Sequence, residues 1–509
     1  MTRYAIWAIV GFYLVFAILY ARATPYRQAG VLMNQRLAGK PMPVPDVGAP
    51  DERQHANYIV GLREGKGFPI LVPGAPDLGE TYQSHQPPLY YLLATGWCAV
   101  TGSNPAEPND GFKLRFLNIL IGGGTIMGLY FAALWGFRGS RLDVQSVALA
   151  TAAIGLMPMF IALNAAVGND PLLILICTWA FALMALSVRD GWTVRRSVTI
   201  GVLIGLGLLT KTSALALIPT VMVAIVLTKS GLPSPAPAKP TESQSNAAEE
   251  RGGGRGKSES LRTGEEGDAG KLPAVQKSPP PKRGRVREGA QADGVGPDAG
   301  ETPAVQGGFN PKVLAFAMAI LPALLIALPW WMRNQRLYGD PLALKAFNAA
   351  FVGNPQASVF IDGIGPARYW LDMVGWWTLR SFFGAFGYMD VFLPEKLYRF
   401  LTAAFVLLAI GWVLSLKGED KAIRAVHWIG ATFLVIVLLQ FVQFNLTYFQ
   451  GQARYLYPAF VVIALGLGVG SVRLIGRWGW LAPLVLLVGL DAYVLSILGP
   501  EFARRMSGA

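Results

Sequence analysis

The sequence is poor in charge and nearly lacks cysteine and histidine. Only 15% of its residues are charged, whereas soluble domains carry about 25%. Hydrophobic residues instead make up 53% of the chain. This balance excludes an ordinary soluble protein and indicates a polytopic membrane protein.

The two cysteines and the excess of positive charge each exclude a further class. Cys98 and Cys177 both lie in apolar segments, so we expect neither a disulfide framework nor a cysteine-based metal site. The formal net charge of +13 invites a nucleic-acid partner. However, the basic residues mostly flank apolar segments, which is the pattern of cytoplasmic loops in membrane proteins. We therefore expect a bilayer as the partner and no nucleic acid.

The apolar segments predict an all-α fold with about eleven transmembrane helices, because about 20 apolar residues are needed to span a bilayer. The segment 197–228 is long enough for two short helices, with a break at Thr210-Lys211-Thr212. The first helix has no small-residue cleavage site behind it, so we interpret it as an uncleaved span. The remaining predicted spans are 5–21, 115–135, 146–166, 170–188, 313–331, 398–416, 425–446, 455–472 and 478–498.

Basic residues predict which side each loop faces. The apolar run 88–100 is too short to span, and leaving it at the interface places most basic loops in the cytoplasm. The N-terminus is then inside and the C-terminus outside. The first loop, 22–114, carries interfacial helices and faces the non-cytoplasmic side together with loop 332–397.

A polar stretch divides the chain. Residues 229–312 are rich in Pro, Gly, Ser, Lys and Glu and have few aromatic residues. This composition buries too little apolar surface to fold, so we predict a disordered, low-complexity cytoplasmic linker. It separates an N-terminal transmembrane catalytic module, 1–228, from a C-terminal transmembrane module, 313–509.

An acidic pair in the first outer loop is the foremost candidate for catalysis. Asp51 and Glu52 precede His55 by about one helical turn, which places one of the two carboxylates on the same helix face as His55. A carboxylate can act as a general base toward an acceptor hydroxyl. Asp is also a favoured helix N-cap residue, and the pair alone does not decide between these two roles.

The histidines of this loop give a weaker signal. His85 and Gln86 precede the Pro-Pro pair that begins an aromatic, interfacial segment. His85 could bind a phosphate, a metal or only a neighbouring backbone group. His55 and His85, with Glu80 and Asp51, would make an oxygen and nitrogen site for a divalent metal. Their spacing matches no established metal motif, so a metal cofactor is only a possibility.

Other polar residues lie where predicted helices meet the outer side. Asn169-Asp170-Pro171 begins a helix and returns a second carboxylate to the side of Asp51, although Asp followed by Pro is also good capping chemistry. Lys211 interrupts an apolar segment, and an ionisable residue at membrane depth is by default a functional hypothesis.

Two arginines add to this positive charge. Arg333 and Arg454 reach the same predicted interface as Lys211 from two further segments. Each alone could be a snorkelling anchor. Together the three cations predict a site for a phosphate or pyrophosphate, for which Arg offers bidentate contacts.

With these residues assembled, the chain resembles the C-type glycosyltransferase superfamily. It is most similar to the bacterial branch related to protein O-mannosyltransferases and lipid A aminoarabinose transferases. The motifs that carry the resemblance, in the family's order, are Asp51-Glu52, Pro87-Pro88-Leu89-Tyr90-Tyr91, Asn169-Asp170, Gly207-Leu208-Leu209-Thr210-Lys211, Trp330-x-x-Arg333-Asn334 and Tyr338-Gly339-Asp340.

This resemblance implies a membrane hexosyl- or pentosyltransferase. Such an enzyme moves a sugar from a polyprenyl-phosphate donor to a glycan, lipid or protein acceptor on the outer face of the membrane, here the bacterial inner membrane. The implied catalytic residues are Asp51, Glu52 and Asp170, and the implied phosphate ligands are Lys211, Arg333 and Arg454. Residues implied to position donor or acceptor are His55, His85, Gln86, Asn169, Asn334, Tyr338 and Asp340. Inversion at the anomeric carbon is the family expectation.

Two departures and one alternative accompany this reading. Some relatives have a basic residue where this chain has Gln86, and the last helix is followed by only a short tail. The alternative is a polytopic lipid or solute transporter or flippase, for which inverted repeats and broken helices in both halves are typical. The sequence shows no such repeat, and its polar residues gather on one side.

Overall fold

The structure, a computed structural model, describes residues 2–228 and 310–508. These residues belong to one compact unit. The predicted linker 229–312 lies outside the described residues except for its last three positions. The division into 1–228, 229–312 and 313–509 therefore stays a prediction.

Eight apolar helices of the described residues are long enough to cross a membrane. They are α1 (Thr2–Ala23), α5 (Gly111–Gly136), α8 (Asp170–Asp190), α11 (Pro311–Tyr338), α16 (Glu395–Ser415), α17 (Lys421–Thr447), α18 (Phe460–Ile475, lengthened to a 19-residue span by the 3-10 turn that begins at Tyr457) and α19 (Leu481–Ser507). A ninth crossing results if α6 (Val144–Ile154) and α7 (Pro158–Asn164), which meet at 63°, form one broken span. The predicted class, a polytopic helical membrane protein, is confirmed.

The predicted count of eleven helices is not confirmed. Segment 197–228 does break as expected, into α9 (Val194–Leu208), the 3-10 helix η3 (Thr212–Ala216) and α10 (Leu217–Leu227). However, α9 has only 15 residues, and η3 with α10 is similarly short. Helices of this length fall below the roughly 20 residues that a bilayer crossing requires.

Small residues let the long helices pack closely. α5 packs on α8, and α9 packs on α11. In the first pair, a Cβ atom at Gly128 would lie 2.8 Å from the side chain of Thr178. In the second, Gly201 and Gly205 of α9 face backbone atoms of α11. The buried alanines of α11 recur at every fourth position, at Ala315, Ala319, Ala323 and Ala327. Such small-residue stripes are typical of helix contacts in membranes.

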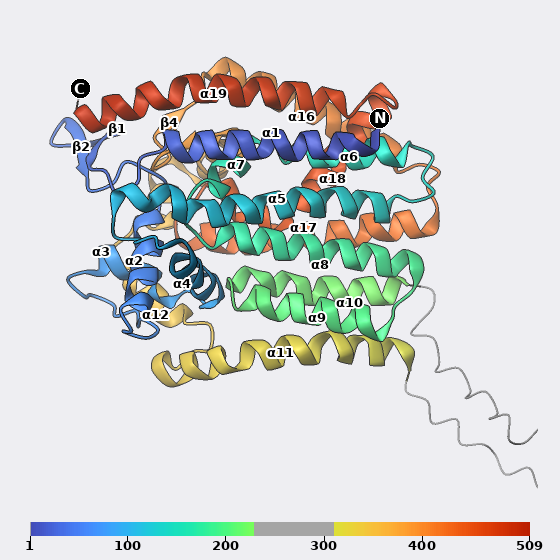
Figure 1. Ribbon diagram of the computed structural model, residues 1–509, viewed down its shortest axis with the longest axis horizontal. Coiled ribbons are helices and arrows are strands. Elements are labelled where there is room, and N and C mark those ends of the chain that lie inside the picture. Colours follow the sequence, from blue (N-terminus) through green and yellow to red (C-terminus); the bar gives the residue numbers. More distant parts are fainter. Residues whose placement is uncertain (1, 229–309, 509) are drawn as a thin grey trace, which may run out of the picture. The chain divides into compact units, whose positions relative to one another are not determined.

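The first outer loop folds into a hairpin and several short helices, which lie at the left-hand end of Figure 1. Strands β1 (Gly30–Leu37) and β2 (Lys40–Val44) pair antiparallel, with Gly30 opposite Val44 and an irregularity between Leu32 and Arg36. The hairpin was not predicted. The helices are α2 (Glu52–Arg63), α3 (Leu78–Thr81), η1 (Tyr82–His85), α4 (Leu89–Thr101) and η2 (Pro108–Asp110).

The remaining short elements follow α11 and α17. After α11 come α12 (Leu344–Ala350), α13 (Ala357–Ile364), α14 (Pro366–Arg368), the π-helix η5 (Tyr369–Gly375), α15 (Trp376–Phe383) and the paired strands β3 (Ala385–Phe386) and β4 (Val391–Phe392). After α17 come η6 (Ala453–Tyr455) and η7 (Tyr457–Ala459). In Figure 1, α12 lies at the same end as α2 and α3.

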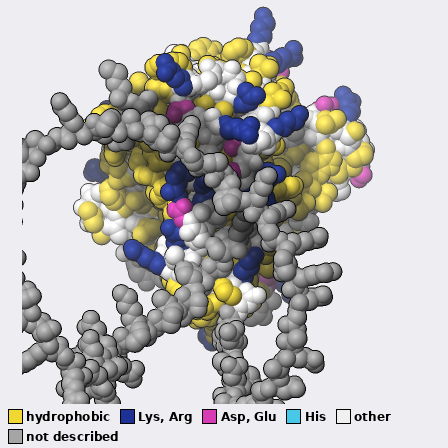
Figure 2. Space-filling model, turned by 90° about the vertical axis from the view of Figure 1, so that its right-hand side faces the viewer, with side chains coloured by type: hydrophobic (Ala, Val, Ile, Leu, Met, Phe, Trp, Pro, Cys, Tyr) yellow, Lys and Arg dark blue, Asp and Glu magenta, His cyan; other side chains and the backbone are white. Residues whose placement is uncertain are grey.

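Basic residues gather at the opposite end of the helices. Figure 2 looks onto the right-hand end of Figure 1 and shows many Lys and Arg side chains there. The connections α5–α6 and α16–α17 carry Arg138, Arg141 and Lys417, and the helix ends beside the connections α8–α9 and α16–α17 carry Arg189, Arg195, Arg196 and Lys421. Basic residues at this end are what the positive-inside pattern predicts for cytoplasmic loops, and the orientation of the bundle stays a prediction.

Candidate functional site

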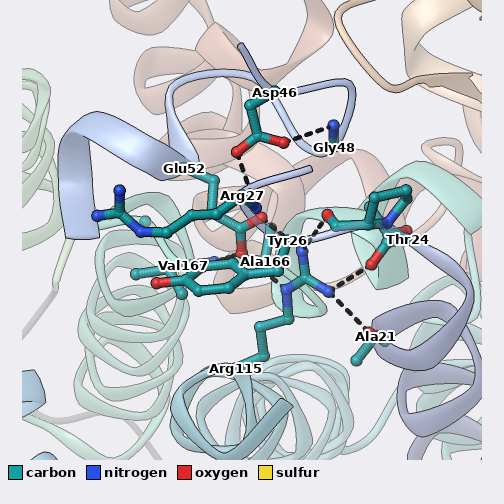
Figure 3. A network of polar contacts seen from close by, with 12 residues as sticks. Ala21, Thr24, Tyr26, Arg27, Asp46, Gly48, Glu52, Arg115, Ala166 and Val167 are labelled. Atoms are coloured by element: carbon teal, nitrogen blue, oxygen red, sulfur yellow. Dashed lines mark hydrogen bonds and ion pairs between the residues drawn. The ribbon is translucent and has the colours of Figure 1, made fainter. Parts of the chain in front are cut away.

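Glu52 forms a buried ion pair at the start of α2 (Figure 3). Arg115 of α5 donates from Nε to Oε1 over 2.8 Å and from Nη2 to Oε2 over 2.6 Å, so the contact is bidentate. The backbone N–H of Val167 adds a third hydrogen bond, at 2.7 Å. The two side chains are only 1% and 2% exposed.

The same arginine fastens the end of α1. Arg115 donates to the carbonyl oxygens of Ala21, Thr24 and Pro25 over 2.7 to 2.8 Å. The ion pair of Arg115 and Glu52 thus connects α1, α2, α5 and the turn before α8. Glu52 is saturated by these contacts, and its surroundings are those of a structural junction.

Asp51, the preceding residue, has different surroundings. Its φ angle is 65°, in the left-handed region that costs most residues on the order of 1–2 kcal/mol. It occupies the N-cap position of α2, yet its side chain makes no capping hydrogen bond. The carboxylate instead accepts a hydrogen bond from the Tyr82 hydroxyl at 2.5 Å and pairs with Arg454 Nη1 at 2.6 Å. The capping alternative for Asp51 is therefore not realised.

Charge pairing keeps Asp51 ionised. Burial by itself raises the pKa of this carboxyl, but Arg454 and the Tyr82 hydroxyl outweigh it and lower the pKa to about 2. Asp51 is therefore an anion at any physiological pH. It is a weak base as long as both partners remain in place.

A second ion pair joins Asp170 and Lys211. Asp170 is the first residue of α8, and Lys211 lies at the break between α9 and η3. Their Oδ1 and Nζ atoms are 2.5 Å apart, and their side chains are 12% and 19% exposed. The Asp170 carboxylate pairs with the charge of Lys211 at a point where the helix is interrupted. Such a pairing is expected for an ionisable group at membrane depth.

The two pairs lie around the same imidazole. His55 is buried, and Asp51, Asp170, Lys211 and Arg454 all act on its charge. Burial lowers the pKa of His55 to about 4 against the opposing effect of the two carboxylates. The ring is therefore neutral near pH 7, and its Nδ1 shares a 2.8 Å hydrogen bond with the Tyr91 hydroxyl.

Tyr455 provides a further link between the pairs. Its ring lies 5.8 Å from Lys211 Nζ and 5.3 Å from the Arg454 guanidinium carbon. Two carboxylates and two cations from four separate segments thus converge on one place. We call Asp51, Asp170, Lys211 and Arg454 the paired cluster.

His85, Gln86 and Asn169 form a chain of polar contacts beside this cluster. His85 Nδ1 lies 2.8 Å from the carbonyl oxygen of Tyr82, and its Nε2 lies 3.2 Å from Gln86 Nε2. Asn169 Nδ2 donates to Gln86 Oε1 and to the carbonyl oxygen of Thr210, each at 3.1 Å. These contacts connect η1, α8 and the break before η3.

Arg333 lies apart from the pairs. It donates to the carbonyl oxygens of Phe68 and Pro69 at 3.1 and 2.8 Å, and its guanidinium carbon lies 4.5 Å from the Trp330 ring centroid. Within residues 2–228 and 310–508, it makes no hydrogen bond or ion pair with Asp51 or Asp170. The expected group of three cations is thus present as two, and the phosphate-binding role of Arg333 stays a prediction.

The remaining positioning candidates mainly shape the backbone. Asn334 Nδ2 donates to the carbonyl oxygen of Pro341 at 3.1 Å. Tyr338 accepts from the N–H of Leu71 at 3.0 Å. Asp340 accepts from the N–H groups of Leu342 and Lys345, each at 3.0 Å. The contacts of Asn334 and Asp340 fix the turn between α11 and α12, whereas Tyr338 joins α11 to the loop after α2. A part in substrate binding stays a prediction for all three.

The possible metal set is not assembled. In residues 2–228 and 310–508, no three His, Cys, Asp or Glu side chains come together as metal ligands. Glu80 instead accepts from Arg53 Nε at 2.8 Å, and His85 faces backbone and amide groups.

Sequence reasoning missed two important side chains. Tyr82 binds Asp51, and Arg115 binds Glu52. Tyr82 precedes the recognised His85-Gln86-Pro87 run by three residues. Arg115 is a charged residue near the start of an apolar span, which is itself a signal for a buried partner.

A comparison with protein families identifies part of the chain. Residues 85–237 match the family model described as dolichyl-phosphate-mannose-protein mannosyltransferase. The resemblance predicted from the motifs is confirmed. The matched segment contains the Pro87–Tyr91, Asn169–Asp170 and Gly207–Lys211 motifs, whereas Asp51, Arg333 and Arg454 lie outside it. The chain is thus an integral membrane protein with a segment similar to this mannosyltransferase family.

Solved membrane enzymes give partial superpositions. The Archaeoglobus fulgidus oligosaccharyltransferase tethered with an acceptor peptide containing the NVT sequon matches with a TM-score of 0.49 and 12% identity, over 99% of this chain and 55% of that chain. The same enzyme with an inhibitory peptide and a dolichol-phosphate gives 0.46 and 12%, over 97% and 56%. ArnT from Cupriavidus metallidurans bound to undecaprenyl phosphate gives 0.44 and 14%, over 98% and 74%. This chain therefore spans about half the length of the archaeal enzyme. Among curated proteins, no sequence matches it.

Proposed function

We propose that this protein transfers a sugar from a polyprenyl-phosphate donor to an acceptor hydroxyl. The observation that carries the proposal is the paired cluster, in which two carboxylates and two cations from four segments meet. Transfer from a lipid phosphate requires both kinds of group, because a proton must leave the acceptor while negative charge develops on the phosphate. The family match of residues 85–237, described by a lipid-phosphate sugar donor, supports the same reaction class.

In the proposed step, the acceptor oxygen attacks the anomeric carbon and its proton passes to Asp51. The bond between the anomeric carbon and the phosphate oxygen breaks, and the phosphate keeps the electron pair. Lys211 and Arg454 bind the phosphate as its charge increases. The attack takes place on the face opposite the leaving group, so the product is inverted, as the resemblance implies.

Phosphate binding would also activate the base. In the free protein, Arg454 holds the pKa of Asp51 at about 2, which makes the carboxylate a poor proton acceptor. A lipid phosphate that takes over Arg454 would raise the pKa of Asp51 toward the value of an ordinary carboxyl. In the same way, Lys211 would leave Asp170 for the phosphate. The donor then generates the base that the reaction needs, and Arg454 Nε, which has no partner among the described residues, is available as one more donor.

The other predicted catalytic residue, Glu52, would then act through position. Its pair with Arg115 holds the first turn of α2 and thereby the backbone of Asp51. We propose Asp51 as the base, Asp170 as the carboxylate that holds Lys211 before the donor arrives, and Glu52 as a positioning residue.

The proposed location is the bacterial inner membrane, with the paired cluster facing the periplasm. The basic end of the bundle shown in Figure 2 would face the cytoplasm, where short basic loops remain. The proposed sugar is a hexose or pentose, and the proposed acceptor is a glycan, lipid or protein.

The experiment offers purified protein in liposomes a set of labelled polyprenyl-phosphate sugars and nucleotide sugars. Label is followed into lipid, glycan and protein fractions. We expect label to leave only the lipid-phosphate donors, and unlabelled polyprenyl phosphate to inhibit this transfer competitively. Movement of the labelled lipid between leaflets without transfer would instead establish the transporter alternative. Transfer from nucleotide sugars alone would contradict the proposed donor.

A further inference from the structure

An apolar loop, residues 68–72, lies shortly after the end of α2 and exposes alternate side chains. Phe68, Ile70 and Val72 are 40%, 50% and 54% exposed, whereas Leu71 between them is 2% exposed. We call residues 68–72 the apolar loop. Isolated apolar side chains on a surface are common, but three adjacent ones on one edge form a patch that needs a partner.

The loop has a defined conformation. Its flanks include Gly65, Gly67 and Gly74, whose φ angles of 73° to 76° lie in the left-handed region. Two prolines, Pro69 and Pro73, restrict the backbone between them. The backbone of the apolar loop is therefore restricted, and its exposed side chains have defined positions on the surface.

Side chains of α11 hold the loop in place. Arg333 donates to the carbonyl oxygens of Phe68 and Pro69, and Tyr338 accepts from the N–H of Leu71. The Phe68 ring meets the Trp330 ring edge to face, with centroids 5.6 Å apart. The loop is thus attached to the last turns of a helix long enough to span the membrane.

The surface of α11 next to the loop is itself apolar. Its exposed side chains continue to the end of the helix and include Leu321, Leu325, Leu328, Met332 and Leu337. Tryptophan and arginine at the end of such a helix are typical of the level of the lipid headgroups. The exposed edge of the apolar loop therefore continues the lipid-facing surface of α11.

We propose that Phe68, Ile70 and Val72 insert into the bilayer interface at the end of α11. The partner is the phospholipid leaflet on that side, since the exposed apolar face of α11, a helix long enough to span the membrane, continues onto the loop. The insertion holds α2, and with it Asp51 and His55, at a fixed depth beside the membrane. The proposal does not depend on the chemistry of the paired cluster.

Site-directed spin labelling tests the depth of the loop. Nitroxides are attached at Ile70→Cys or Val72→Cys in the full chain, after Cys98 and Cys177, both buried, have been replaced by alanine. Accessibility to oxygen, which concentrates in lipid, is compared with accessibility to a water-soluble nickel complex in phospholipid vesicles. Leu325→Cys on α11, 60% exposed, is the lipid reference, and Glu107→Cys in the same outer loop is the aqueous reference.

The two loop positions should favour oxygen, as position 325 does, while position 107 favours the nickel complex. An Ile70→Glu substitution beside a label at position 72 should move that label toward the aqueous value. Nickel accessibility at positions 70 and 72 equal to that at position 107 would overturn the proposal. Exclusion of both reagents at these positions would also overturn it, because it would indicate cover by protein.

Discussion

Two adjacent acidic residues of this protein form ion pairs with opposite properties. Glu52 and Arg115 are closed off from solvent, and their hydrogen-bonding groups connect the ends of several helices. Asp51, the residue before Glu52, and its partner Arg454 keep 19% and 13% of their side chains exposed. The second carboxylate of the cluster, Asp170, is similarly accessible in its pair with Lys211.

This difference in burial separates an ion pair that supports the fold from one that can exchange its partner. A pair that is fully buried and bidentate is difficult to open, because each separated charge would remain in a medium of low polarity. A pair near the surface can exchange one partner for another anion at a small cost. The contrast therefore assigns the permanent framework to Glu52 and the replaceable contacts to Asp51, and each prediction below tests one side of it.

The largest effect is expected from removing the proposed base. Asp51→Asn should reduce transfer by about 10²- to 10⁴-fold, the range of general base catalysis, while the protein stays folded. Initial rates from a polyprenyl-phosphate donor in liposomes measure this. Glu107→Gln, which removes an exposed carboxylate of the same loop, is the matched control and should keep full activity. An unchanged rate for Asp51→Asn would remove this residue from the mechanism.

Breaking the buried pair should act on stability. Arg115→Ala leaves the Glu52 charge buried and unpaired, so we expect a loss of about 3–5 kcal/mol of unfolding free energy. Denaturant unfolding in detergent measures it. Arg454→Ala, in the more exposed pair, should destabilise the protein less. Equal losses for the two variants would contradict the distinction between framework and exchange.

Tyr82→Phe should remove the hydrogen bond that the Tyr82 hydroxyl donates to Asp51, the proposed base. A hydrogen bond to a charged group is worth about 1.5–3 kcal/mol, and here it orients the Asp51 carboxylate. We expect the lost orientation to outweigh the gain in basicity and to lower kcat roughly tenfold, with little change in KM for the donor. Because the hydroxyl lowers the pKa of Asp51, its removal should raise that pKa above about 2. The acidic limb of the pH–rate profile should therefore shift to higher pH. A profile identical to the wild type would show that Tyr82 only packs beside Asp51.

The framework region also predicts a dependence of stability on pH. Burial raises the pKa of Asp46 from 3.8 to about 6, against hydrogen bonds from the N–H groups of Gly48 and Arg27 (Figure 3). The resulting stabilisation is complete below pH 3.8 and is lost as the pH rises through about 6. Unfolding at several pH values should show a loss on the order of 2–3 kcal/mol across this window. In Asp46→Asn this loss should disappear, and its persistence would assign it to another group.

The smallest effect is expected outside both regions. Deletion of 236–306, within the stretch predicted to be a linker, should leave transfer close to the wild-type rate, because its composition provides little apolar surface for packing. The comparison is made at equal amounts of inserted protein. A strong loss of donor turnover with normal insertion would show that these residues contribute to the site.

The general class could be read from the sequence, and the count of spans could not. Length and hydropathy identify a helical membrane protein, since these are properties of each segment alone. The sequence predicts the short helices α9 and α10 as spans because their apolar character resembles that of the long ones. Their length was decided by the break at Lys211, which pairs with Asp170.

The sequence by itself determined which residues could carry chemistry, because charged groups in an apolar chain are few and their positions at helix ends are visible. Only the tertiary structure decided how they combine. It joined Asp51 to Arg454, Asp170 to Lys211 and Glu52 to Arg115, and it placed Arg333 against the apolar loop. Such pairings join residues far apart in the chain, so they depend on how the helices pack. The same packing sets the solvent exposure that makes one acidic residue a support and its neighbour a candidate base.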